Sequence, residues 1–143
     1  MILYLDTCAL VKFYVQETGS DDVRGWLQDA DAAATSWVAY AEARAAFARA
    51  LREGITGPEH HAERVDQFNR DWEALIRVEL TPPVASNAGD LAEVHGLRGF
   101  DSIHLASALW LRDKVSPAQV AFAAFDRRLV AAAEGAGFEH LSR

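Results

Sequence analysis

The chain has 143 residues, half of them hydrophobic, which suits one compact domain with a sizeable core, so we expect a single domain over residues 1–143. It has neither an apolar stretch of bilayer-spanning length nor a basic leader, so we expect a cytoplasmic protein without a membrane partner. The single cysteine, Cys8, excludes an internal disulfide and a cysteine-based zinc cluster. The net charge of −7 disfavours nonspecific binding to nucleic acid.

Hydrophobic patterning predicts strands that alternate with helices along the chain. We expect strands over residues 2–5, 32–36 and 119–125, an irregular or edge segment at 80–84, and an edge strand at 138–141. The expected helices cover 8–16, 20–30, 37–52, a segment from Pro58 with an apolar stripe to Ile76, 85–95, a segment opening at Asp101, and 129–134. This alternation predicts an α/β sandwich around a mainly parallel sheet.

Four carboxylates occupy positions where acidic residues are uncommon. Asp6 and Asp126 each end an apolar run. Glu42 lies in an alanine-rich helical segment, and Asp101 opens an apolar helix. Because ligands of open parallel sheets bind beyond the C-terminal ends of the strands, we expect Asp6 and Asp126 at one edge. The other two acids lie near helix starts, so all four can reach that edge.

Carboxylates gathered in this way need a counter-charge. Two of them about 4 Å apart repel by roughly 4 kcal/mol at an effective dielectric of 20. Mg²⁺ prefers oxygen ligands, and Mn²⁺ uses similar ones, whereas the chain offers no histidine pair for zinc beside the acids. The pattern therefore predicts a Mg²⁺ or Mn²⁺ site that activates water for phosphodiester hydrolysis, with Arg127 or Arg128 neutralising phosphate charge.

Each acid also has a purely structural interpretation. Asp101 and Asp126 could each cap the helix that follows, and Glu42 alone is typical of a solvated helix residue. For the whole chain, one alternative is a phosphoryl-accepting regulatory domain, but the sequence lacks the required second acid beside Asp6 and the late lysine. Another is a non-catalytic module that binds only RNA or protein. The joint pattern favours a catalytic site because one geometry explains all four acids.

Four segments carry a family resemblance in addition to these acids. Residues 4–14, 36–46, 97–106 and 125–129 read YLDTCALVKFY, SWVAYAEARAA, LRGFDSIHLA and FDRRL. In this order they resemble the motifs of PIN-domain proteins, specifically the VapC-type ribonuclease toxins of bacterial toxin–antitoxin pairs. The motifs span nearly the whole chain.

The resemblance implies a PIN-like three-layer α/β/α sandwich with a mainly parallel central sheet. It also implies a Mg²⁺- or Mn²⁺-dependent endoribonuclease acting on tRNA, rRNA or mRNA. The expected assembly is a homodimer whose site is blocked by a cognate VapB-type antitoxin. The family's metal-binding and catalytic acids correspond to Asp6, Glu42, Asp101 and Asp126.

Several neighbouring positions follow or depart from the family pattern. Thr7 follows the first acid, as the family usually has it, and is a candidate to support the metal ligands. Cys8 replaces a common serine, and Ala124 stands where a threonine is common, two residues before the last acid. His104 lies one helical turn after Asp101, and we expect it to pack or to support a ligand rather than to catalyse.

Overall fold

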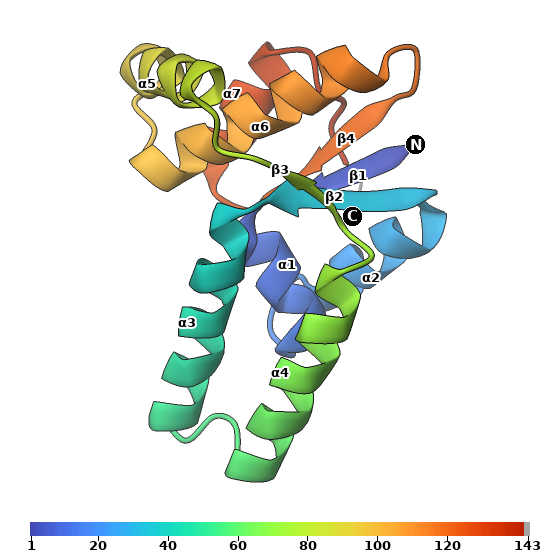
Figure 1. Cartoon of the computed structure of the whole chain (residues 1–143), viewed down its shortest axis with the longest axis vertical. Coiled ribbons are helices and arrows are strands. Elements are labelled where there is room, and N and C mark those ends of the chain that lie inside the picture. The colour runs from blue at the N-terminus through green and yellow to red at the C-terminus, as the bar shows by residue number, and fades with distance from the viewer. Residues whose placement is uncertain (142–143) are drawn as a thin grey trace.

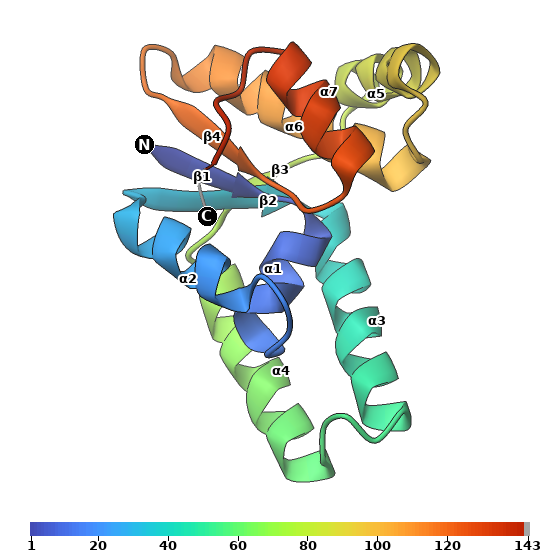
Figure 2. The same ribbon diagram turned by 180° about the vertical axis from the view of Figure 1, so that it is seen from behind.

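The computed structural model describes residues 1–141, which form four strands and seven helices (Figure 1). The strands are β1 (Ile2–Leu5), β2 (Ala32–Ser36), β3 (Ile76–Val78) and β4 (Val120–Ala123). The helices are α1 (Thr7–Tyr14), α2 (Ser20–Asp29), α3 (Val38–Arg52), α4 (Pro58–Trp72), α5 (Pro82–His95), α6 (Gly99–Val115) and α7 (Arg127–Gly135). Helices α5, α6 and α7 cover one face of the sheet, and α1 and α2 lie on the other (Figures 1 and 2). The expected three-layer α/β/α sandwich is confirmed.

All four strands are parallel and follow the order β3-β2-β1-β4. Ile2 is in register with Ala32 of β2 and with Val120 of β4. Since β1 lies between two partners, its C-terminal end opens near the centre of one edge of the sheet. The ladder continues past the strand, where the Asp6 amide donates to the carbonyl of Ala123 at 3.1 Å. This bond fixes the backbone at the point where the first predicted acid leaves the sheet.

The sheet separates two apolar cores because successive side chains of a strand point to opposite faces. Tyr4 packs with the core beneath α6 and α7, where Leu105, Phe122 and Leu129 are its buried neighbours. Leu3 and Leu5 enter the other core, beneath α1 to α4. β1 therefore anchors both layers.

Helices α3 and α4 form an antiparallel hairpin that extends away from the sheet (Figures 1 and 2). Aromatic rings hold its base: Phe47 and Phe68 lie edge to face with centroids 5.3 Å apart, and Tyr14 of α1 meets both rings. Phe47, Phe68 and Trp72 are almost fully buried, so these aromatic rings belong to the core beneath α1 to α4. Within residues 1–141, none of the helices combines the length and apolarity needed to cross a membrane.

The segment before α5 differs from the sequence-based expectation. Ile76, expected on the apolar stripe of a long helix, instead belongs to β3 and pairs with Ala34, because α4 ends at Trp72. The edge strand is therefore β3, and residues 80–84 include the start of α5. Thr81 caps that helix and Pro82 takes its first position, where proline needs no amide hydrogen.

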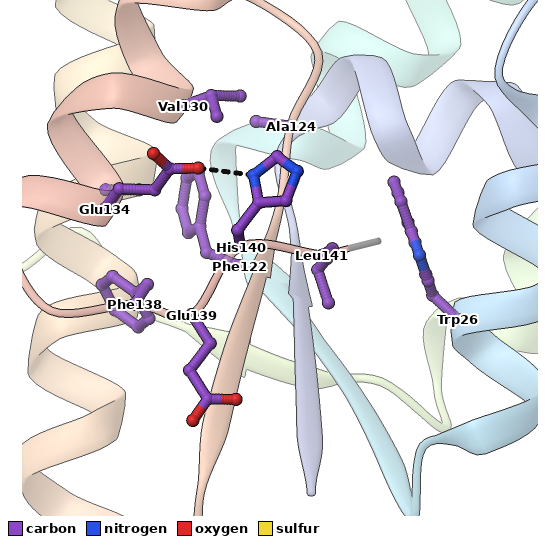
Figure 3. Close-up of a pocket in the computed structure, with 10 residues that line it drawn as sticks. Trp26, Phe122, Ala124, Val130, Glu134, Phe138, Glu139, His140 and Leu141 are labelled. Carbon is purple, nitrogen blue, oxygen red and sulfur yellow. Dashed lines mark hydrogen bonds and ion pairs between the residues drawn. The ribbon is translucent and has the colours of Figure 1, made fainter. Parts of the chain in front are cut away.

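The expected edge strand at 138–141 is not formed. The Phe138 amide donates to the carbonyl of Ala133, so it completes the end of α7 instead of joining a strand. The following residues lie against α7, where His140 Nδ1 meets Glu134 at 2.5 Å (Figure 3). Among the described residues, a cavity of about 40 Å³ beside this segment is lined by none of the four predicted acids.

Gly19 gives a stability prediction at the start of α2. Its φ is +93°, and a Cβ there would lie 2.6 Å from Cε1 of Phe125, the residue before Asp126. Gly19→Ala should therefore lower the free energy of unfolding by about 1–3 kcal/mol, as measured by denaturant titration. Gly25 is the matched control, because it lies inside α2 with nothing within 4 Å of its added Cβ. Gly25→Ala should raise stability by about 0.4–1 kcal/mol; equal effects would contradict the steric argument.

Candidate active site

Three of the four predicted acids open on one cleft at the carboxyl edge of the sheet. The cleft has a volume of about 590 Å³. Asp6 comes from the end of β1, Glu42 from α3 and Asp101 from the first turn of α6. The other lining residues are Thr7, Cys8, Arg98, Gly99, Phe100, Ile103 and His104. Three distant segments of the chain thus bring these carboxylates to one edge of the sheet, as the sequence predicts.

Asp6 is the most buried of the four acids, with 3% of its surface exposed. It is the N-cap of α1, and its Oδ1 accepts a hydrogen bond of 2.8 Å from the Ala9 amide. Burial raises the pKa of this carboxyl to about 6, against the lowering effect of His104 and the Ala9 amide, and the negative charges of Asp101 and Glu42 add to the rise. Within residues 1–141, no ion pair of Lys or Arg reaches Asp6. The site therefore holds a buried acid that no Lys or Arg side chain of the described residues neutralises.

Glu42 has the opposite electrostatic environment. Its Oε1 accepts a hydrogen bond of 2.5 Å from the Thr7 hydroxyl and lies 3.4 Å from His104 Nε2. Burial alone would raise the pKa of Glu42, but the hydrogen bonds from His104 and Thr7 outweigh it and hold the pKa below its ordinary value. Glu42 is therefore not a solvated helix residue; it is a carboxylate held ionised at the cleft wall.

Asp101 lies in the first turn of α6 rather than at its cap. The N-cap position belongs to Arg98, so the alternative that Asp101 caps this helix is wrong. Asp101 Oδ2 instead accepts from Arg98 Nε at 3.0 Å, and the Asp101 side chain is only 16% exposed. Because this arginine is 78% exposed, the pair lies at the mouth of the cleft.

Asp126 lies in a neighbouring cleft of about 420 Å³. It caps α7, since its Oδ1 accepts from the amides of Arg128 and Leu129, both at 3.0 Å. Arg98 and Asp101 line both clefts and so connect them. The fourth acid is thus adjacent to the other three and also has the capping role that the sequence allowed.

The two arginines after Asp126 differ in their contacts. Arg128 Nη1 donates to the carbonyl of Gly96 at 2.9 Å, which ties α7 to the end of α5. Arg127 lines the same cleft and is exposed. Ala124 points into the small cavity of Figure 3 and is only 8% exposed.

The donor set fits a hard divalent cation. All four acids offer oxygen ligands, and Mg²⁺ commonly uses one or two carboxylates and keeps several waters. The buried Asp6 carboxyl, without a Lys or Arg partner in the described chain, is the group that a cation would stabilise most. Over residues 1–141, no three His, Cys, Asp or Glu side chains are already arranged as a complete ligand cluster.

Sequence reasoning missed part of this site. The hydrophobic pattern places Tyr4 only within a buried strand, but its hydroxyl lies 2.9 Å from His104 Nδ1. A fully buried tyrosine needs a partner for its hydroxyl, and that requirement was the available signal. We expect His104 to pack or to support a ligand, and it is 1% exposed and contacts Thr7, which contacts Glu42.

Burial raises the pKa of the Cys8 thiol to about 11, and the negative charges of Asp6 and Asp101 add to this rise. The raised pKa disfavours a thiolate nucleophile at this position.

A parallel α/β sandwich with carboxylates at the carboxyl edge is the class of fold that these observations define. The PIN domain model matches residues 3–135, and the chain belongs to the PIN-domain family. The resemblance to its VapC-type members is confirmed by sequence. Ribonuclease VapC45 and Ribonuclease VapC49, from two strains of Mycobacterium tuberculosis, are each 41% identical over 136 residues, which cover 95% of this chain and 92% of theirs.

Solved structures agree on the fold. The crystal structure of FitAcB from Neisseria gonorrhoeae superposes with a TM-score of 0.66 at 19% identity and covers 94% of each chain. A toxin–antitoxin complex from Klebsiella pneumoniae gives a TM-score of 0.60 at 14% identity, over 84% of this chain and 82% of that one. At these identities the likeness concerns the fold alone.

The raised pKa of Asp6 predicts how the stability of the metal-free protein depends on pH. The folded carboxyl holds its proton more tightly than the unfolded one, so this contribution is complete below pH 3.8 and is lost as pH rises through about 6. The displacement from 3.8 to about 6 corresponds to roughly 3 kcal/mol. Denaturant titrations across this range should show the loss in wild-type protein and not in Asp6→Asn, which carries no titrating group.

Millimolar Mn²⁺ should restore the lost stability on the alkaline side of that transition. A wild-type pH profile that coincides with that of Asp6→Asn would show that Asp6 is not the strained carboxyl.

Proposed function

We propose that this chain is a metal-dependent endoribonuclease, the toxin of a VapBC-type toxin–antitoxin pair. The observation that carries the proposal is the convergence of Asp6, Glu42 and Asp101 on one cleft, in a chain 41% identical to Ribonuclease VapC45. Its substrate is an RNA phosphodiester bond, and its cofactor is Mg²⁺ or Mn²⁺. Asp6, Glu42, Asp101 and Asp126 are the candidate ligands.

A bound divalent cation would supply Lewis acidity for activating a water and neutralising charge on the phosphate. The chain's own residues define the surroundings of that chemistry. Thr7 and His104 keep Glu42 ionised and oriented, and burial leaves the Asp6 carboxylate poorly compensated, so a cation would stabilise it. The raised pKa of Cys8 favours the protonated thiol, which disfavours Cys8 as a nucleophile beside them.

The arginines beside the clefts suit the phosphate groups of RNA. The chain carries a net charge of −7, so attraction to RNA must be local. Arg98, Arg127 and Arg128 line the cleft that holds Asp126, and Arg98 also lines the acidic cleft. A strand passing over Asp101 would therefore meet positive charge beside the acids.

The partners follow from the same assignment. A VapB-type antitoxin would block the acidic cleft, and two copies of the chain would form a homodimer. A structural neighbour that is a toxin–antitoxin complex supports the antitoxin partner. The cytoplasmic location, the homodimer and the choice among tRNA, rRNA and mRNA stay predictions.

Charge-neutral substitutions of the acids test the proposal. Asp6→Asn, Glu42→Gln and Asp101→Asn should each reduce Mg²⁺-dependent RNA cleavage by about 100-fold or more, because each removes an ionised oxygen ligand in the cleft. Each should also relieve the growth arrest caused by induction of the wild-type chain. Cleavage is measured with purified protein and total RNA, and growth with inducible expression.

Asp126 needs a pair of variants, because it caps α7 as well as lining a cleft. Asn caps helices about as well as Asp, so Asp126→Asn should keep its stability, while Asp126→Ala should lose about 1 kcal/mol. A metal-ligand role predicts that both variants lose cleavage.

Full cleavage and full toxicity in the Asn variants of Asp6 and Asp101 would refute the nuclease proposal.

The two neighbouring arginines provide a matched pair for RNA binding. In an Asp6→Asn background, Arg127→Ala should weaken binding and reduce the slope of log affinity against log salt by about 0.7, the value for one phosphate contact on a single strand. Arg128→Ala should change that slope less, because the Arg128 guanidinium already donates a hydrogen bond to the Gly96 carbonyl and is less available to a phosphate. Fluorescence anisotropy with labelled RNA measures both. Equal slopes for the two variants would contradict the distinction.

A further inference from the structure

A line of buried hydrogen bonds runs from the core beneath α6 to the acidic cleft. The Tyr4 hydroxyl lies 2.9 Å from His104 Nδ1, and His104 Nε2 lies 2.9 Å from Thr7 Oγ1. The Thr7 hydroxyl in turn contacts Glu42 Oε1 at 2.5 Å. Tyr4 is fully buried and His104 is 1% exposed, so solvent cannot replace these partners. Tyr4 and His104, which lie 100 positions apart in the sequence, are thus connected through Thr7 to the candidate metal ligand Glu42.

The direction of these bonds follows from the number of hydrogens. An ionised Glu42 only accepts, so the single Thr7 hydrogen points to Oε1. Thr7 Oγ1 then has only lone pairs for His104, and Nε2 must carry the hydrogen. In a neutral imidazole Nδ1 is then the acceptor, and the Tyr4 hydroxyl is its donor. Every donor therefore points toward the carboxylate.

We infer that Tyr4 and His104 are positioning residues, which fix the Nε2–H tautomer of His104 so that Thr7 and His104 together hold Oε1 of Glu42. This inference rests on the proposed function, since it concerns a ligand of the proposed cation. With Oε1 held in this way, Oε2 makes no hydrogen bond within residues 1–141 and is the oxygen left for a cation. Partners of this kind orient metal ligands elsewhere, and their loss typically costs about 10- to 100-fold in metal affinity or activity.

The same geometry sets His104 apart from a general base. A base needs a free nitrogen within reach of the substrate, but both ring nitrogens are occupied within the fold. The Tyr4 ring adds rigidity, because it lies edge-on to the imidazole at 70° and stacks on Phe122 at 5.5 Å. The imidazole is therefore held from two sides while its Nε2 faces Thr7.

Four substitutions separate positioning from simple stability. His104→Leu removes the donor to Thr7, whereas His104→Gln places an amide hydrogen near the position of Nε2–H. Tyr4→Phe removes only the hydroxyl, which contacts Nδ1 and also interacts with Ser107. Tyr14→Phe is the matched control, because it removes a tyrosine hydrogen bond of 2.7 Å to Asp71, which lies outside the cleft.

Three measurements on the full chain are decisive. Calorimetric titration with Mn²⁺ should show a loss of about 10- to 100-fold for His104→Leu, a smaller loss for Tyr4→Phe, and near-wild-type affinity for His104→Gln and Tyr14→Phe. RNA cleavage should fall in kcat in the same order, with KM for RNA unchanged. Selective ¹⁵N-histidine NMR of metal-free protein at mildly alkaline pH should show the hydrogen of His104 on Nε2 in the wild type and a mixture of tautomers in Tyr4→Phe.

The outcomes distinguish this inference from the proposed function. Mn²⁺ affinity in Tyr4→Phe equal to that in Tyr14→Phe, or a wild-type His104 with its hydrogen on Nδ1, would overturn the inference alone. His104→Gln as impaired as His104→Leu, with both variants folded by circular dichroism, would also overturn it. Wild-type protein that neither binds Mn²⁺ nor cleaves RNA would overturn the proposed function, and the positioning role with it.

Discussion

The Asp6 carboxylate lies at the end of an inner parallel strand, nearly shielded from water, with one oxygen bonded to the first turn of α1. That capping bond is needed because the strand passes into the helix without a loop. The remaining negative charge is what the fold does not satisfy, since burial and two neighbouring acids raise the pKa of Asp6. A cation would stabilise such a buried carboxylate, and this supports the proposed metal site.

Glu42 shows how the same cleft keeps two carboxylates in different states. Both are drawn from water, yet Glu42 receives hydrogen bonds from Thr7 and His104 that hold its pKa low. Asp6 receives only one backbone amide and stays strained. The fold therefore stabilises the Glu42 carboxylate with hydrogen bonds, whereas the buried Asp6 carboxylate stays largely uncompensated. Environment, rather than residue type, separates the two roles.

The sequence predicts much of this arrangement because strand ends of a parallel sheet share an edge. That rule predicts Asp6 and Asp126 at one edge, and the position of Asp101 at a helix start places it there too; the structure puts Asp6 and Asp101 in one cleft and Asp126 in the next. The rule could not show that Asp126 would lie in the adjoining cleft, since it fixes an edge and not a position along it. The Tyr4–His104 contact was hidden for another reason: periodicity places both residues in the core but says nothing of which polar atoms meet there. Short β3 was missed because the preceding apolar pattern continues that of α4.

Arg98 would help this acidic protein bind the RNA substrate that we propose. Its side chain is highly exposed, and its bond to Asp101 spans the boundary between the two clefts. Exposed ion pairs contribute little to stability, so this guanidinium is not committed to Asp101. If a cation takes the carboxylate, the arginine becomes available to a phosphate at the same place. In the proposed function, cation binding would lower the negative charge of the cleft and free a positive charge beside it, so RNA binding would depend on the metal.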